Sequence, residues 1–266
     1  MTNQERLDAI LRRVSDQHGK LNAKQQAYAI REIGRVRGDI ADLLADFAGA
    51  DGSIERRRLN RLLRELDEVE RNIRRYGDAA MSGIITETAD WTTTRINNGL
   101  ERAIGSAGVT ANMEQINRQV VNYVARRFES DGLVLSDRVW RLAGDERDKI
   151  ASVLRTDILR GESVGTMIRN VRRVHDNDTW KIERLVVTEG NTAYRAAADF
   201  NAKASEVVTG LRLHPGIKRS KGCVDLANED RYGLGKGVFL PGDSDVYNPH
   251  PNCTSYVTYE IDSRWL

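Results

Sequence analysis

Apolar residues recur every three or four positions along most of the first 200 residues, which is the spacing of one face of an α-helix. A first short helix is expected around Leu7–Val14, ending near Gly19. Two longer series then follow, Ile33, Val36, Ile40, Leu43, Phe47 and Leu59, Leu62, Leu66, Val69, Ile73, Tyr76. The break at Gly49–Gly52 between these two heptad-like series predicts an antiparallel helical hairpin within residues 22–76.

Helical patterns continue, less regularly, as far as residue 204. His175 falls in a polar stretch that is expected to be a loop, where its imidazole would be solvated. The helices are expected at residues 78–104, 113–128, 136–142, 145–158, 163–171 and 179–204.

The composition changes abruptly near Gly210. The segment from His214 to Ile261 holds both cysteines, two of the four histidines and all four prolines. Its prolines and glycines exclude a long helix, and short strands are expected at Gly237–Leu240 and Ser255–Tyr259. This change predicts a C-terminal module that folds separately.

The expected fold class is therefore mainly α, with an elongated N-terminal region of helical hairpins and a small, loop-rich α+β module at the C-terminal end. Three divisions are expected: long helices over residues 1–132, shorter helices over 133–205 and the compact module over 206–266.

The composition favours long solvated helices over a single dense globule, because 30% of the residues are charged and only 6% are aromatic. The net charge of +2 excludes a general polycation, so any binding of DNA would need a local patch. The cluster Arg56, Arg57, Arg58 is the candidate, since it lacks comparable compensation by nearby acidic residues. The alternative is a solvated helix face with ion pairs to the interleaved glutamates.

Membrane insertion and secretion are not expected. No apolar run approaches the roughly 18 residues of a membrane span, and the first residues are those of a charged amphipathic helix. Two cysteines do not make an oxidised secreted scaffold. The chain is expected to fold in a cytoplasm.

Four residues of metal-binding type lie in the C-terminal segment, namely His214, Cys223, His250 and Cys253. The closely spaced His250 and Cys253 could present two ligands to one ion, and the other two could complete a tetrahedral zinc set. Further candidates are the nearby carboxylates Asp225, Glu229, Asp243 and Asp245. Two alternatives stay open: a disulfide between the cysteines, or cysteines that are buried as small apolar residues beside hydrogen-bonded histidines.

Glu189 falls on the apolar face of the last long helix. A carboxylate there is costly to bury unless it is paired. A structural role is therefore expected, with bonds to backbone N–H groups or to an arginine of the C-terminal module, rather than a catalytic or metal-binding role.

Several stretches carry a family resemblance: Thr188-Glu189, His214-Pro215, Gly222–Ala227, Asp230–Phe239 and Pro249–Cys253. Together they resemble the C-terminal module of phage head morphogenesis proteins, the Mu F-like minor capsid proteins of tailed bacteriophages. The resemblance covers roughly residues 135–262. The chain departs from the family pattern at Val187, where the family usually has arginine, and at Ser255, where it has a second cysteine.

The resemblance implies a non-enzymatic minor head protein, associated with the portal inside the capsid and acting in head assembly, genome packaging or DNA ejection. It implies the portal protein as a partner, with capsid or scaffolding protein and double-stranded DNA as further candidates. The expected location is the head interior of the virion, and the host cytoplasm during assembly. In this setting Arg56–Arg58 would contact the portal or DNA.

Two other functions stay open. One is a zinc-dependent nuclease or other hydrolase, with Glu189 or Asp225 as the general base. The other is a helical DNA-binding protein whose binding depends on salt. The sequence contains no catalytic triad, phosphate-binding loop or dinucleotide-binding fingerprint, which favours a structural protein.

Overall fold

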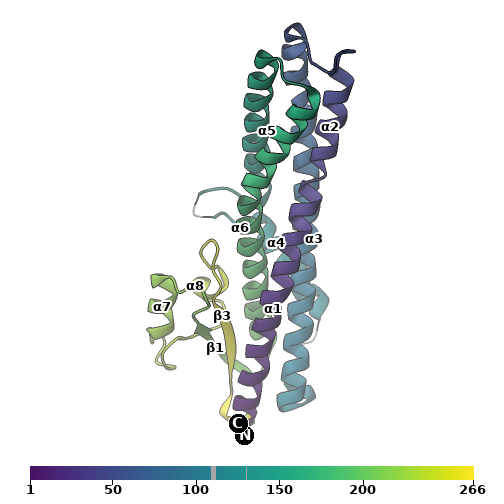
Figure 1. The fold of residues 1–266 in the computed structure, drawn as a ribbon. Coiled ribbons are helices and arrows are strands. Elements are labelled where there is room, and N and C mark those ends of the chain that lie inside the picture. Colours follow the sequence, from purple (N-terminus) through teal and green to yellow (C-terminus); the bar gives the residue numbers. More distant parts are fainter. Residues whose placement is uncertain (109–111, 130) are drawn as a thin grey trace. The chain divides into compact units, whose positions relative to one another are not determined.

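The computed structural model describes residues 1–108, 112–129 and 131–266, and its fold is mainly α with a small sheet near the C-terminal end (Figure 1). This confirms the expected fold class. The helices are α1 (Asn3–Ile33), α2 (Val36–Phe47), α3 (Leu59–Ile104), α4 (Met113–Arg126), α5 (Leu135–Arg160), α6 (Val164–Ala204), α7 (Lys221–Asn228) and α8 (Ser244–Tyr247). The strands are β1 (Val208–His214), β2 (Val238–Phe239) and β3 (Tyr256–Ile261), and short 3-10 turns lie at Arg56–Arg58, Ser106–Gly108 and Ser263–Trp265. Among the described residues, no helix is long and apolar enough to cross a membrane.

The chain forms two compact units, and each is assembled from segments that are distant in sequence. The first, called the sheet unit, contains residues 1–25, 82–127 and 184–266. The second, called the hairpin unit, contains residues 26–81 and 128–183. The helices α1, α3 and α6 contribute residues to both units, so these units cut across the sequential divisions expected at residues 132 and 205.

The hairpin unit contains the antiparallel pair expected on either side of Gly49–Gly52. Helix α2 ends at Phe47 and α3 begins at Leu59, and Asn72 of α3 donates a hydrogen bond to Asp39 of α2 (2.9 Å). The buried residues of the pair are Val36, Ile40, Leu44, Phe47, Leu62, Leu66, Val69 and Ile73. The three-four spacing therefore identified the packed faces, with Leu44 buried in place of Leu43.

Helix α1 does not end near Gly19 as expected, but continues to Ile33. Its buried face keeps the same spacing beyond Val14, yet the residues there are His18, Asn22 and Gln25. Gln25 donates a hydrogen bond to Thr88 of α3 (3.0 Å), so a polar layer continues the packed face. The sequence predicted an end of the helix at this layer because the prediction used the spacing of apolar residues alone.

Helices α5 and α6 likewise replace the shorter helices expected between residues 136 and 204. His175, expected in a solvated loop, lies within α6 and is buried. Its Nδ1 is 2.7 Å from Oε1 of Glu146 on α5, which is also buried. This contact pairs Nδ1 of the ring with a carboxylate inside the protein, while the buried Nε2 has no hydrogen-bond partner among the described residues.

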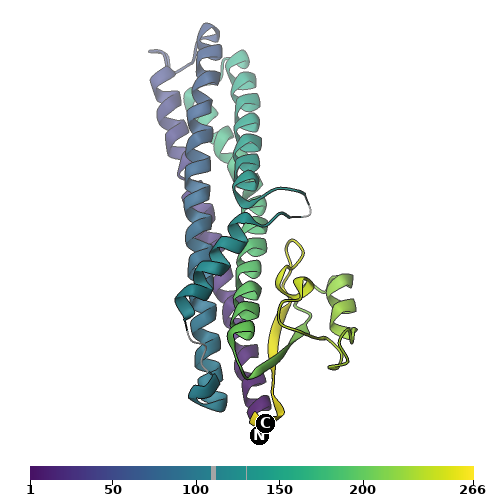
Figure 2. The same ribbon diagram turned by 180° about the vertical axis from the view of Figure 1, so that it is seen from behind.

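The three strands form an antiparallel sheet in the order β2-β1-β3, with Leu211 of β1 aligned with Phe239 and with Tyr259. Strands β2 and β3 fall where short strands were expected, whereas the central strand β1 was missed. In both ribbon views the sheet lies beside α6 (Figure 1; Figure 2), and the Tyr259 hydroxyl donates a hydrogen bond to the carbonyl oxygen of Ala198 on that helix (2.6 Å).

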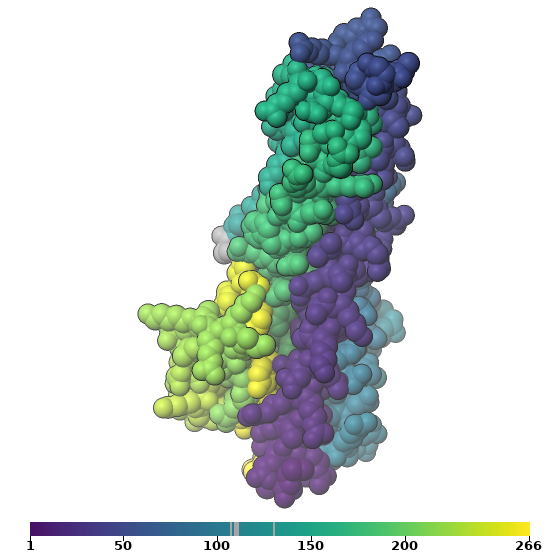
Figure 3. Space-filling view, viewed as in Figure 1, coloured from purple at the N-terminus to yellow at the C-terminus, as the bar shows by residue number. Residues whose placement is uncertain are grey.

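The sheet shares its hydrophobic core with the helices of its unit. This core includes Leu7 and Leu11 of α1, Ile96 and Leu100 of α3, Ala198 and Ala202 of α6, and Leu211, Phe239 and Tyr259 of the sheet. Figure 3 shows the start of the chain in purple against the C-terminal residues in yellow, and Gln4 donates a hydrogen bond to the carbonyl oxygen of Tyr259 (2.6 Å). The apolar face of the sheet in the expected C-terminal module is thus covered by helices from earlier in the chain, and separate folding of this module stays a prediction.

Candidate metal centre

Two local structures bring the cysteines and one histidine together. At the start of α7, the hydroxyl of Ser220 accepts a hydrogen bond from the backbone N–H of Cys223 and caps the helix (3.2 Å). Before β3, residues 250–253 form a turn in which the N–H of Cys253 bonds to the carbonyl of His250 (3.2 Å). Pro251 occupies the second position of this turn and Asn252, at φ 60°, the third, which are the residue preferences of a type II turn.

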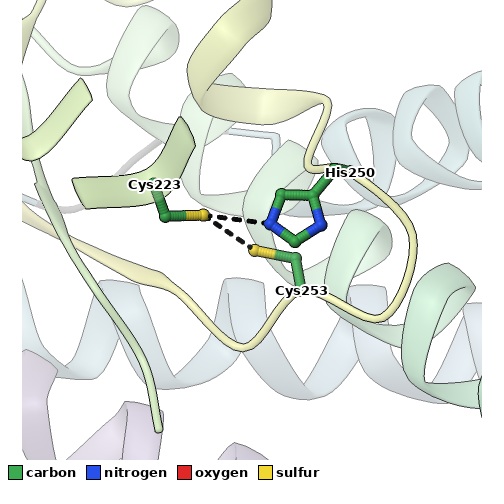
Figure 4. A group of neighbouring side chains, drawn as sticks. All are labelled: Cys223, His250 and Cys253. Atoms are coloured by element: carbon green, nitrogen blue, oxygen red, sulfur yellow. Dashed lines mark hydrogen bonds between the residues drawn. The ribbon is translucent and has the colours of Figure 1, made fainter. Parts of the chain in front are cut away.

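Cys223, His250 and Cys253 form a compact group in which the potential ligand atoms all lie within 4.8 Å of one another (Figure 4). The Sγ of Cys223 lies 3.5 Å from the Sγ of Cys253 and 3.1 Å from Nε2 of His250. Two sulfur ligands of a tetrahedral zinc ion lie about 3.8 Å apart, given bonds of about 2.3 Å. The group could therefore bind a metal ion with a small outward movement of its atoms.

Access to the group is one-sided. The residues Cys223 and Cys253 are 3% and 1% exposed, whereas His250 is exposed. Both thiols are free. An ion would thus reach the sulfurs from the side of the histidine.

Polar side chains on one face of α6 bind the backbone of the turn at residues 250–253. Thr188 accepts a hydrogen bond from the N–H of Asn252 (3.0 Å), and Asn191 donates one to the carbonyl of Cys253 (3.1 Å). One turn further along, Arg195 is fully buried, and its Nη1 lies 3.9 Å from the Sγ of Cys253. These contacts fix the backbone that carries two of the three candidate ligands.

The two thiols shift each other's pKa in opposite directions. Hydrogen bonding from Cys253 is the main cause that lowers the pKa of Cys223, and bonds with Ser220, Ser255 and His250 add to this effect while burial opposes it. The pKa of Cys253 is raised, first by its hydrogen bond to Cys223 and then by burial. The contact between the two sulfurs thus favours loss of one proton from the pair, and the thiolate is the form that binds metal ions.

His214 does not belong to the group, which corrects the expected set of four ligands. It ends β1, where its Nε2 lies 2.9 Å from the hydroxyl of Thr258 and its ring stacks on Tyr256. Burial, followed by the charges of Arg12 and Arg212, lowers the pKa of His214 to about 4. The sequence suggested it because it is close along the chain, but the pairing of β1 with β3 directs it elsewhere.

The carboxylates considered as substitute ligands make other contacts. Arg231 forms ion pairs with Glu229 and Asp243, each at 2.9 Å, and with Asp245, also at 2.9 Å. Asp225 is not a member of the Cys-His-Cys group found among the described residues.

The whole chain was also compared with known proteins. No family model matches it, and it matches neither a curated protein nor a solved structure. Its function therefore has to be inferred from its own residues and their geometry.

Glu189 is fully buried and paired, as a structural carboxylate should be. Its Oε2 lies 3.0 Å from Nη2 of Arg127, and this same nitrogen donates to the hydroxyl of Thr192 (3.1 Å). The expected partners were backbone N–H groups or an arginine of the C-terminal module, whereas Arg127 directly follows α4. Arg127 also donates a hydrogen bond to Asn248, and so links α4, α6 and the loop before the metal-binding turn.

The arginines of the cluster at residues 56–58 each have a local contact in the hairpin unit. Arg56 donates to the carbonyl of Leu159 (2.6 Å), Arg58 donates to the carbonyl of Phe47 (3.1 Å), and Arg57 is paired with Glu55. Arg57 remains largely exposed. A contact of this cluster with DNA or with a portal stays a prediction.

Arg127, Arg195 and Ser255 were not identified as site residues from the sequence. A signal existed for Arg195, because Thr188, Asn191 and Arg195 place polar groups at spacings of three and four on a helix with many alanines. For Arg127 there was none, since its contact with Glu189 joins residues 62 positions apart.

Proposed function

We propose that this protein is a minor head protein of a tailed bacteriophage, which acts at the portal in head assembly, genome packaging or DNA ejection and catalyses no reaction. The sequence stretches that resemble the Mu F-like proteins motivate the proposal. Their contacts support it, because three of these stretches meet in the sheet unit although they are far apart in the sequence.

The observation that carries the proposal is the set of bonds between these stretches. Thr188, of the Thr-Glu pair, holds the backbone of Asn252 in the closing Pro249–Cys253 stretch, and Cys253 contacts Cys223 of the Gly222–Ala227 stretch. Residues that serve one common structure are expected to recur together in related chains. The resemblance therefore concerns a connected three-dimensional unit.

The metal that suits the group best is zinc, held for a structural purpose. Two thiolates and an imidazole are the ligands of structural zinc sites, and soft sulfur ligands disfavour magnesium and calcium. Cys223, His250 and Cys253 would hold the ion, which would cross-link the start of α7 to the turn before β3. Residues 215–255 carry few other regular elements, so such a cross-link would stabilise them against unfolding.

Hydrolysis is the second candidate, because three protein ligands leave one position of a zinc ion open. The buried Glu189 does not suit the role of general base, since it is ion-paired with Arg127. Metal-loaded protein should therefore leave DNA uncut. Cleavage that is lost in the Cys253→Ser variant would replace the structural proposal with the hydrolase.

The role at the portal is tested with the full chain. Protein recovered from infected cells should co-purify with the portal protein of the same phage, and purified virions should contain it in few copies. Virions that lack the chain, together with no recovery of the portal protein, would contradict the proposed function.

Zinc is tested by elemental analysis of full-length protein purified without added metal. We expect about one zinc per chain, lost in the His250→Gln variant and retained in the matched His214→Gln variant. Zinc near zero in the unaltered protein, with both thiols reactive, would exclude the metal centre. Equal loss from both histidine variants would contradict the ligand set.

A further inference from the structure

Ser255 lies directly beside the two cysteine sulfurs. Its Oγ is 2.8 Å from the Sγ of Cys253 and 3.7 Å from the Sγ of Cys223, and the residue is 1% exposed. An oxygen ligand and a sulfur ligand of the same tetrahedral zinc ion lie about 3.6 Å apart, given typical bond lengths. The distances from the hydroxyl to the two sulfurs are therefore similar to those between ligands of one zinc ion.

Arg195 fixes the orientation of this hydroxyl. Its Nη1 donates a hydrogen bond to the Oγ of Ser255 (2.9 Å), and its Nη2 donates to the carbonyl of Asp245 (3.1 Å). The guanidinium is buried on a rigid helix, so the serine oxygen receives its hydrogen bond from a fixed direction. Such bonds from outside a metal site hold its ligands in place.

A second hydroxyl, that of Ser220, lies near the histidine, with its Oγ 2.8 Å from Nε2 of His250. It already accepts the N–H of Cys223 as the cap of α7, and it is less buried than Ser255. The contacts described for Ser255 Oγ are instead the two sulfurs and Arg195. The two serines therefore differ in what their oxygens can offer a metal ion.

We propose that Ser255 supplies the fourth ligand of the metal ion held by Cys223, His250 and Cys253, and that Arg195 positions the serine oxygen. The inference rests on the proposed metal centre and makes its ligand set specific. A protein oxygen in the fourth position closes the site to water, and so favours a structural ion over a catalytic one.

The test compares full-length protein with its Ser255→Ala and Ser255→Cys variants and with a control variant, Ser82→Ala, each loaded with Co²⁺ or Zn²⁺. Visible absorption of the cobalt forms reports coordination geometry and the number of sulfur ligands. Competition with a chelator reports zinc affinity. Circular dichroism identifies any variant that fails to fold.

We expect Ser255→Ala to lower zinc affinity by at least about tenfold, because the fixed protein oxygen is lost. The tetrahedral cobalt bands should weaken, because the opened site can take up a fifth ligand from solvent. Ser255→Cys should add sulfur-to-cobalt absorption and bind zinc more tightly. Ser82→Ala should stay within about threefold of the unaltered protein, because this exposed serine of α3 lies outside the Cys-His-Cys group.

Three results would contradict the inference. Unchanged affinity and cobalt spectrum in Ser255→Ala, with normal metal binding by the unaltered protein, would exclude the serine ligand and leave the metal centre intact. No added sulfur absorption in a folded Ser255→Cys variant would do the same. Failure of the unaltered protein to bind either ion would overturn the metal centre itself, and the inference with it.

Discussion

The buried pair of Arg127 and Glu189 allows a quantitative test of how the sheet unit is held together. The two side chains are 3% and 0% exposed and lie 3.0 Å apart, so solvent screens them little. At an effective dielectric constant of about 20, two unit charges at this distance attract by about 5 kcal/mol. Desolvation offsets part of this attraction, but removal of one partner of such a pair typically costs about 3 to 5 kcal/mol.

We therefore expect Glu189→Gln and Arg127→Met each to lower the free energy of unfolding by about 3 kcal/mol or more. The double variant should lose at least about 1 kcal/mol less than the sum of the single variants, because the two groups interact directly. A matched control is the exposed pair of Glu114 and Arg118 on α4, also in the sheet unit. Its variants should change stability by about 0.5 kcal/mol or less.

Urea unfolding measures these changes, with tryptophan fluorescence as the signal. Replacement of Trp140 and Trp180 by phenylalanine leaves Trp91 and Trp265, which both belong to the sheet unit. The reasoning is refuted if Glu189→Gln costs no more than Glu114→Gln, or if the effects at Arg127 and Glu189 add without coupling. Either result would mean that hydrogen bonds, rather than the ion pair of Arg127 and Glu189, connect α6 to the loop that contains Asn248.

Three further changes test separate parts of the fold. Leu66→Asp places a charge at a fully buried position of α3 and should cost several kcal/mol, so a melting temperature equal to that of the parent would exclude a packed hairpin. Burial lowers the pKa of His18 to about 4, against a weaker opposing bond to a backbone carbonyl, so the folded chain binds fewer protons than the unfolded one between pH 6.5 and 4. Stability should fall by up to about 3 kcal/mol as the pH is lowered through this range, and a pH series of melts on His18→Phe should be flatter. Gly216→Ala would bring a Cβ within 1.9 Å of the carbonyl oxygen of Thr254 and should destabilise the loop between β1 and α7, whereas Gly222→Ala meets no atom within 4 Å and should be neutral by the same thermal melt.

The sequence alone determined the fold class and the faces of the helices that are packed apolar on apolar. The spacing of Leu62, Leu66, Val69 and Ile73 indicates a buried helix face wherever it occurs, because burial of apolar surface follows the helical repeat. The sharp turn at residues 250–253 is likewise determined by neighbouring residues, since Pro251 and Asn252 suit its second and third positions. The nearness of His250 to Cys253 therefore followed from neighbouring residues.

Tertiary structure decided what polar residues do inside the protein. The length of α1 depends on a buried layer around Gln25 and Thr88, and the continuity of α6 depends on the pairing of His175 with Glu146. A polar side chain has no fixed preference for the interior, because its burial is favourable only where a distant partner satisfies it.

The candidate metal centre divides in the same way. The residue types Cys223, His250 and Cys253 were visible in the sequence, but the exclusion of His214 and the approach of Ser255 were not. Strand pairing turned His214 towards Thr258, and helix α6 placed Arg195 against Ser255. Ligand geometry on the scale of 3 Å is set by contacts between distant segments, from the 27 positions between Cys223 and His250 to the 60 positions between Arg195 and Ser255. Such contacts form only when the chain is folded.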